Sequence, residues 1–362
     1  MTEVHGLAAV AATFCVDGEL KSIERYGSGH IHDTYSVRFG SDRSSGHILL
    51  QRINTRIFEN PIALMENIER VTKHVRSRLT GIADAERRVL QLLASREGRS
   101  WNVDAEERYW RAYYFIEGAE TFDEVTSSRQ AFEAAKAFGV FQRMLVDLPG
   151  ARLAEAIPNF HNTPKRFMDF EFAVDRDKAK RCKGVEQEIA FAMSRMAISG
   201  ALVDAGLPER VTHNDTKLNN ALLDERTGEG ICVIDLDTVM PGLVAHDFGD
   251  MVRTMTCPAA EDELDLSRVE MKFSLFEAVL RGYLAGAGDF LTADERESLI
   301  AGAKVIVFEQ GIRFLTDFLV GDRYYKVSRR GQNLDRCRTQ FRLLTSIEQQ
   351  ESAMVRLLRA AE

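Results

Sequence analysis

A short polar segment carries the strongest sign of chemistry in this 362-residue chain. Residues 213–220 read HNDTKLNN, so Asp215 follows a histidine by two positions and Asn220 follows Asp215 by five. This order and spacing are typical of the catalytic loop of phosphoryl-transfer kinases. Phosphoryl transfer to an alcohol needs a carboxylate beside the attacking hydroxyl and a divalent cation held by oxygen ligands. Asp215 suits the first role and Asn220 the second.

A second metal ligand is expected at the end of a neighbouring strand. Residues 231–234 form an apolar run that predicts a buried strand, and Asp235 follows it immediately. Such a strand would hold this carboxylate rigidly at the mouth of the active-site cleft. The ammonium of Lys217, two positions after Asp215, could stabilise charge on the transferred phosphoryl group. The alternative is a polar hairpin in which Asp215 and Asn220 only cap turns.

Residues 247–249 spell Asp-Phe-Gly, which is the metal-binding signature of protein kinases. No apolar strand precedes them, and a Pro-Gly pair interrupts the approach. We therefore interpret Asp247 as the N-cap of a helix with Asp250 in its first turn, and we prefer Asp235 as the metal ligand. A contact between Asp247 and the substrate or metal is the alternative.

The elements that must position these groups fall into two parts. In the first part, residues 35–39 and 47–53 predict a hairpin, Asn60-Pro61 predicts a helix start, and residues 109–116 predict another strand. The second part contains long segments with apolar residues at helical spacing, namely 127–148, 185–205, 268–284, 292–320 and 333–358. Only one strand pair, around the turn at 224–230, is predicted there. The fold class is therefore α+β, with a small mixed part and a large helical part.

Composition excludes several classes of protein. The chain is 45% hydrophobic and 28% charged, which excludes a disordered or low-complexity protein, and its formal net charge of −8 disfavours nucleic acid and membrane surfaces as partners. Five isolated cysteines indicate a reduced, cytoplasmic protein rather than a disulfide scaffold or a zinc site. His30 and His32 lack a nearby third ligand, so they do not indicate a metal site. Neither a signal peptide nor a membrane span is expected.

Several segments resemble the aminoglycoside phosphotransferase and choline kinase superfamily, and within it the N-acetylhexosamine 1-kinases. They are HNDTKLNN, VIDLD with its continuation TVMPGLVAHDFGDMVR, YGSGHIHDTY and LLQRIN. The resemblance implies a bilobal protein-kinase-like fold, with a nucleotide-binding lobe at 1–116 and a helical lobe carrying the catalytic loop and sugar site at 117–362. It further implies ATP, Mg²⁺ and phosphorylation of a small-molecule sugar, GlcNAc or GalNAc, at its anomeric hydroxyl.

The resemblance also indicates where the nucleotide would bind. Gly27, Ser28 and Gly29 precede the first clear strand, where glycines let backbone N–H groups approach the phosphates. An ordinary hairpin turn is the alternative. Phe115 and Ile116 match the hinge at which adenine stacks, although simple core packing would explain them equally well.

One expected group is missing from this pattern. Gln51 occupies the place of the phosphate-binding lysine on the third strand, and Arg52 beside it would point to the opposite face. Glu66 and Glu69 on the following helix are possible ion-pair partners of a strand cation, or they form a solvated face. A pseudokinase therefore stays an alternative to an active kinase.

For the sugar site, the resemblance implies Arg313 and Tyr324, together with Asp215, which would orient the acceptor hydroxyl. An ion pair between Arg313 and Glu309 within one helix is the alternative for the arginine, and packing at a helix junction is the alternative for the tyrosine. Other small alcohols, such as an aminoglycoside, choline or methylthioribose, stay open as acceptors. The oligomeric state stays undetermined.

Overall fold

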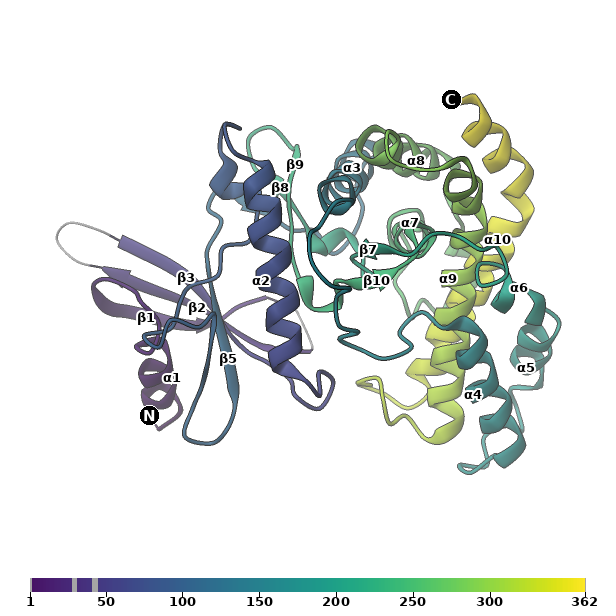
Figure 1. The fold of residues 1–362 in the computed structure, drawn as a ribbon. Helices are drawn as coiled ribbons and strands as arrows, with labels where there is room; N and C mark the ends of the chain where they lie inside the picture. The colour runs from purple at the N-terminus through teal and green to yellow at the C-terminus, as the bar shows by residue number, and fades with distance from the viewer. Residues whose placement is uncertain (1, 28–30, 41–44, 362) are drawn as a thin grey trace. The chain divides into compact units, whose positions relative to one another are not determined.

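A computed structural model describes residues 2–27, 31–40 and 45–361. The chain divides into two compact units, each built from separate stretches of sequence (Figure 1). Unit 1 comprises Met1–Ala119, Leu148–Ile157 and Cys232–Val239, and unit 2 comprises Glu120–Asp147, Pro158–Ile231 and Met240–Glu362. The predicted metal ligand Asp235 therefore belongs to unit 1, whereas the loop with Asp215 and Asn220 belongs to unit 2.

Unit 1 is built on an antiparallel sheet with strand order β1-β2-β3-β5-β4. Its elements are α1 (Thr2–Ala11), β1 (Glu19–Arg25), β2 (Asp33–Gly40), β3 (Ser45–Arg52), α2 (Pro61–Arg78), the 3₁₀ turn η1 (Ala85–Arg87), β4 (Trp101–Val103) and β5 (Tyr109–Tyr114). The predicted hairpin is β2-β3. Asn60 caps α2 by accepting a hydrogen bond from the Ala63 N–H, and Pro61 is its first residue, which confirms the predicted helix start.

The core of unit 1 lies where α1 packs against the sheet. Leu50 of β3 and Trp110 of β5 are buried with Leu7 of α1 and with Phe14, which follows that helix. Because residues alternate between the two faces of a strand, this core fixes which face of β3 carries Gln51. That face carries the polar groups described below.

Unit 2 is mainly helical. Its helices are α3 (Ser128–Leu145), α4 (Thr163–Arg176), α5 (Glu186–Met193), α6 (Met196–Gly200), α7 (Val244–Met255), α8 (Phe273–Ala287), α9 (Ala293–Val320) and α10 (Gln332–Ala360), with 3₁₀ turns η2 (Leu218–Asn220) and η4 (Leu266–Arg268). Short strands β7 (Arg210–Thr212) and β10 (Met240–Gly242) pair with each other, and β8 (Ala221–Asp224) and β9 (Gly230–Val233) form the predicted hairpin. The two-residue strand β6 (Ala119–Glu120) lies beside β8. The predicted α+β class is confirmed.

Several helix boundaries differ from the prediction. The segment 185–205 is not one helix, because the chain breaks between α5 and α6 at Arg195, whose guanidinium forms a bidentate pair with Glu348 of α10 and stacks on Phe191. Helix α9 begins as predicted, with a capping box between Thr292 and Glu295. Among the described residues, no helix has the length and apolar character needed to cross a bilayer.

Helices α7 and α9 pack with their backbones in contact. A Cβ added at Gly302 of α9 would lie 2.1 Å from the Ala245 carbonyl oxygen, and one at Gly249 of α7 would lie 2.3 Å from the Gly302 carbonyl oxygen. Only glycine allows this approach, because any other residue would place a carbon atom inside the neighbouring backbone. The contact fixes the first turn of α7, which supports the loop with Asp215.

Candidate active site

The loop with the kinase-like motif follows β7 directly in unit 2. The His213 side chain is fully buried, and its ring meets the Phe138 ring edge-on at a centroid distance of 5.4 Å. Its Nδ1 accepts a hydrogen bond of 3.3 Å from the Asp215 N–H. His213 therefore supports the loop from the core side.

Asp247 holds the same loop through its backbone. Its carboxylate accepts hydrogen bonds from the N–H groups of His213 (2.8 Å) and Asn214 (2.6 Å) and from the Gln142 amide (2.6 Å), while Thr216 donates to its carbonyl oxygen. The predicted N-cap role is wrong. Helix α7 has already begun when the chain reaches Asp247, and the buried side chain is turned toward the loop rather than toward its own helix end.

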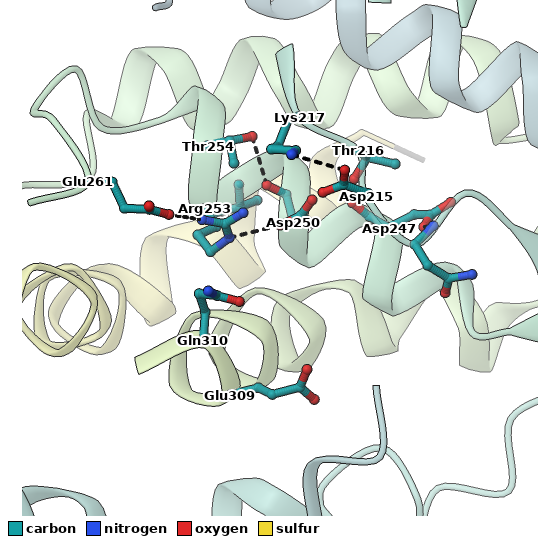
Figure 2. A network of polar contacts seen from close by, with 12 residues as sticks. Asp215, Thr216, Lys217, Asp247, Asp250, Arg253, Thr254, Glu261, Glu309 and Gln310 are labelled. Atoms are coloured by element: carbon teal, nitrogen blue, oxygen red, sulfur yellow. Dashed lines mark hydrogen bonds and ion pairs between the residues drawn. The ribbon is translucent and has the colours of Figure 1, made fainter. Parts of the chain in front are cut away.

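Asp215 lies in a cluster of partners on its own loop. Lys217 Nζ is 3.0 Å from its Oδ2 (Figure 2). Asn220 Nδ2 donates to the same oxygen at 3.1 Å and to the Asp215 carbonyl at 2.8 Å. Burial alone would raise the pKa of Asp215, but Lys217, His213 and Arg253 together lower it below its ordinary value. Asp215 is therefore ionised at neutral pH, which a proton acceptor requires. The Asn220 amide nitrogen faces Asp215, so its oxygen is the atom that can bind a cation.

In unit 1, Asp235 and Asp237 follow β9 in an unusual backbone turn. Asp235 has φ +58°, a left-handed conformation that non-glycine residues seldom adopt, and it leads into the 3₁₀ turn η3 (Leu236–Thr238). Ligand atoms of Asp235, Asp237 and His32 lie within 4.8 Å of one another. This cluster could hold a metal ion only through carboxylates that are not already paired with cationic side chains.

Asp237 already has two partners. Arg111 donates to both of its oxygens, at 2.6 and 2.5 Å, and His32 Nε2 lies 3.3 Å away. Burial alone would raise the pKa of Asp237, but Arg111 and then His32 lower it well below the ordinary value. His32 Nδ1 accepts from the Asn54 N–H, so a neutral ring carries its proton on Nε2 and cannot bind a metal there. These contacts make Asp237 and His32 unsuited to a cation, and Asp235 stays the predicted metal ligand of this cluster.

Gln51 occupies the expected lysine place on β3, and the structure shows what surrounds it. Its Oε1 accepts from Arg111 Nε at 3.0 Å, and its Nε2 donates to Thr34 Oγ1 at 3.0 Å. Arg111, which lies opposite Gln51 on β5, is only 1% exposed. The sequence analysis missed this arginine, although an arginine inside the aromatic strand YWRAYY signals a buried ion pair.

Helix α2 contributes an amide rather than a glutamate to this region. Glu66 is exposed, and Glu69 accepts a hydrogen bond from the Ser100 hydroxyl, so neither pairs with a strand cation as considered from the sequence. Asn67 is buried instead, and it donates to the carbonyl oxygens of Ala154 (2.8 Å) and Val239 (3.3 Å). It thereby ties α2 to the segment that follows Asp237.

The predicted nucleotide positions of unit 1 are described only in part. Gly27 is exposed with φ +78°, whereas Ser28 and Gly29 lie outside the described residues, as does His30. Phe115 stacks on the His47 ring at a centroid distance of 3.7 Å, and Ile116 next to it is half-buried.

The predicted sugar positions lie at the C-terminal part of α9 and in the loop beyond it. Arg313 is 3.7 Å from Glu309, which is too long for a hydrogen bond, and its guanidinium lies over the Phe160 ring at 5.3 Å. Tyr324 is 60% exposed. Asp317 holds the loop by accepting from the backbone N–H groups of Tyr324 and Tyr325, so the rings have a fixed base.

A third arginine, Arg253 of α7, lies near Asp215 and was not predicted (Figure 2). Its Nε donates to Asp250 at 2.8 Å, and its Nη1 lies 3.3 Å from Glu261. Burial alone would lower the pKa of Arg253, but these two carboxylates raise it. The guanidinium is therefore a permanent charge beside the candidate base.

Comparison with known proteins supports the same chemistry. Residues 22–287 match the family described as "Phosphotransferase enzyme family". A microcompartment-associated aminopropanol kinase has a similar structure, with a TM-score of 0.63 and 16% identity over 97% of this chain and 98% of that one. An aminoglycoside phosphotransferase from Alicyclobacillus acidocaldarius has a TM-score of 0.61 and 12% identity over 98% and 95%, respectively.

A third similar structure is the AMP-bound complex of spectinomycin phosphotransferase, with a TM-score of 0.59 and 12% identity over 94% of this chain and 95% of that one. At such low identity these structures show a common fold. The family match covers more than half of the sequence, including the whole loop around Asp215. With an ionised aspartate, an amide and a lysine gathered on that loop, the chain belongs to the phosphotransferase enzyme family.

Proposed function

We propose that the protein transfers the γ-phosphoryl group of ATP to the anomeric hydroxyl of an N-acetylhexosamine, GlcNAc or GalNAc. Asp215 orients the hydroxyl and accepts its proton, and Lys217 stabilises charge on the transferred group. The lobe at 1–116 binds the nucleotide through Gly27, Ser28, Gly29, Gln51, Phe115 and Ile116, and the lobe at 117–362 binds the sugar. The anomeric position follows from the sequence resemblance, and the ionised Asp215 supports the base.

Mg²⁺ would be held by Asn220 and Asp235. An amide oxygen and a carboxylate are hard oxygen ligands of the kind that this cation prefers. Asp237 is unsuited, because Arg111 already donates to both of its oxygens. The bound ion would supply neutralisation of phosphate charge, while the residues of the chain orient the acceptor and remove its proton.

The nature of the acceptor is supported by the charges around Asp215, and this observation carries the proposal. Among the described residues of unit 2, Lys217 pairs with Asp215 and Arg253 pairs with both Asp250 and Glu261, while Asp247 is held by backbone and amide N–H groups. Arg313 adds a further cation beside the predicted sugar position. An ammonium group at that position would meet the Arg313 guanidinium, whereas a neutral acetamido sugar needs only hydrogen-bond donors and an aromatic face. Choline and aminoglycosides are therefore disfavoured.

A substrate panel tests this assignment. ADP release should be measured with GlcNAc, GalNAc, glucose, choline, ethanolamine and kanamycin, each with and without Mg²⁺. We expect Mg²⁺-dependent turnover with the acetamido sugars and a product without a reducing end, detected by ³¹P NMR. Turnover confined to the cationic acceptors would contradict the proposal that the acceptor is an acetamido sugar. A phosphate on another hydroxyl would contradict the proposed anomeric position.

A pseudokinase is the second candidate, because Gln51 replaces the strand lysine. It predicts a thermal shift with ATP and no ADP release with any acceptor of the panel. Retention of Asp215, Asn220 and Asp235 favours the active enzyme.

A further inference from the structure

A buried histidine, His161, lies just before α4 and between α9 and the loop with Asp215. Its Nδ1 lies 2.9 Å from Glu309 Oε1, and its Nε2 lies 2.9 Å from the Asn214 carbonyl oxygen. Its side chain is only 8% exposed and that of Glu309 only 1%. His161 thus joins the residue before Asp215 to a helix that is distant in sequence.

Both partners of this imidazole are hydrogen-bond acceptors. A carbonyl oxygen can only accept, and an ionised carboxylate can only accept, so both contacts are hydrogen bonds only when both ring nitrogens carry protons. Glu309 is ionised: burial alone would raise its pKa, but His161, Arg313 and a hydrogen bond of 2.6 Å from Thr163 lower it to about 2. With Glu309 ionised, the geometry fits an imidazolium cation.

The other charged groups around the ring fit this state. Burial alone would lower the pKa of His161, but Glu309 and the two hydrogen bonds raise it above its ordinary value, against a smaller effect of Arg313. His246 of α7 lies 5.0 Å away between ring centroids, and burial together with His161 lowers its pKa to about 3, so it is neutral. Arg166 of α4 donates to the neighbouring Phe160 carbonyl. Glu309 is thus the carboxylate bonded to His161.

We propose that His161 is a positioning residue that anchors the loop with Asp215 only while its ring carries two protons, so that turnover is lost in alkaline solution. Loss of one proton leaves a nitrogen lone pair facing either the Asn214 carbonyl or Glu309. Since Asn214 has φ +64° and precedes Asp215, release of its carbonyl displaces the base. The inference rests on the proposed role of Asp215, but not on the identity of the acceptor.

The direction of the pH effect follows from the raised pKa. The imidazolium is fully present below the ordinary histidine value of about 6.5 and disappears as the pH rises through the higher folded value. The kcat should therefore fall by about 10- to 100-fold on the alkaline side, which corresponds to one lost charge-assisted hydrogen bond. We call this fall of kcat at high pH the alkaline limb. Protonation of Asp215 cannot cause it, because a proton acceptor loses its function on the acid side of the pH profile.

Three variants separate positioning from simple packing. His161→Phe keeps a ring without donors, and we expect low kcat at every pH and no alkaline limb. Glu309→Gln lets the amide donate to Nδ1 of a neutral ring while Nε2–H still reaches Asn214, so the alkaline limb should disappear although His161 is present. Thr163→Val removes a buried hydrogen bond from the same carboxylate without touching the ring, and it should retain the limb. A limb that persists in Glu309→Gln would overturn the proposal.

A measurement without substrate decides the protonation state separately. Histidine-selective ¹⁵N NMR of the full chain, assigned with His161→Phe, should show both nitrogens of His161 protonated at pH 7. A neutral ring at that pH would overturn the proposal even if the enzyme phosphorylates a sugar. Conversely, a doubly protonated ring with no turnover on any acceptor would overturn the proposed function and leave the anchor intact.

Discussion

At the scale of single residues, the charge of Asp215 depends on cations that come from two elements. Lys217 lies on the same loop, and Arg253 reaches it from α7 (Figure 2). Their combined field outweighs the effect of burial, which by itself would favour the protonated acid. This half-buried carboxylate is held in its ionised form, so it can accept a proton at neutral pH.

The first prediction concerns this carboxylate directly. Asp215→Asn keeps the size of the side chain but removes the proton acceptor, so kcat should fall by about 10² to 10⁴-fold. Coupled ADP release at saturating substrates measures this loss. Asp169→Asn, on the exposed face of α4, is the matched control and should leave kcat unchanged. Full turnover in Asp215→Asn would exclude this residue as the base.

The second prediction concerns the cation beside it. Lys217→Met removes the largest favourable charge at Asp215, so the pKa of Asp215 should rise. Because the base acts only when ionised, the acid limb of the kcat profile should move to higher pH, in addition to a lower maximum. Lys165→Met, which removes an exposed lysine of α4, should leave the limb in place. An unshifted limb in Lys217→Met would show that this charge does not control the base.

At the scale of elements, α7 connects the core of unit 2 to the loop with Asp215. Its first turn carries Asp247, which accepts from two successive backbone N–H groups of that loop. The other side of α7 is pressed against α9 through Gly249 and Gly302. Any change that separates α7 from α9 should therefore also move the loop.

The third prediction tests this contact. Gly302→Ala places a Cβ within 2.1 Å of the Ala245 carbonyl oxygen, so the helices must move apart, and the free energy of unfolding should fall by about 1–3 kcal/mol. Urea denaturation measures it, and kcat should fall with it. Gly6→Ala, at an exposed site in α1 with no neighbour within 4 Å, should change stability by less than about 1 kcal/mol and not lower it. Equal behaviour of the two variants would contradict the close packing.

At the scale of the whole molecule, contacts between distant parts of the sequence hold the candidate metal ligand. Arg111 and Asp237 are 126 positions apart, yet their side chains form a buried bidentate pair within unit 1. Asp235 is two residues before this pair in the chain. The long-range pair therefore fixes the turn that presents Asp235.

The fourth prediction concerns stability and its pH dependence. Because the folded pKa of Asp237 is lowered, its contribution is complete above the ordinary value of about 3.9 and is lost as the pH falls through the lower folded value. Arg111→Met leaves an uncompensated buried carboxylate, which should cost about 3–5 kcal/mol at pH 7. Towards pH 5 the uncompensated Asp237 should become protonated, so the difference in free energy of unfolding between the variant and the unmodified protein should become smaller. Urea denaturation at both pH values measures this, and the double variant Arg111→Met with Asp237→Leu should recover part of the loss.

The sequence by itself determined the groups that lie close together along the chain. Hydrogen bonds between residues a few positions apart depend only on local geometry. They explain the contact between Asp215 and Asn220 and the helix caps at Asn60 and Thr292, and the strand before Asp235 was predicted from a local apolar run. The α+β class followed from the same local patterns, and the kinase-like fold followed from the family resemblance.

Only the tertiary structure decided the partners that come from distant segments. Three contacts join residues more than 30 positions apart in the sequence. They are the bond between His161 and Glu309, the pair of Arg111 with Asp237, and the bonds from Asp247 to the loop with Asp215. The spacing of residues in the sequence does not predict such pairs. A buried donor needs a hydrogen-bond acceptor, and only the fold determines which distant acceptor lies within reach. For the same reason the exact role of Gln51 became visible only when Arg111 was found opposite it on the neighbouring strand.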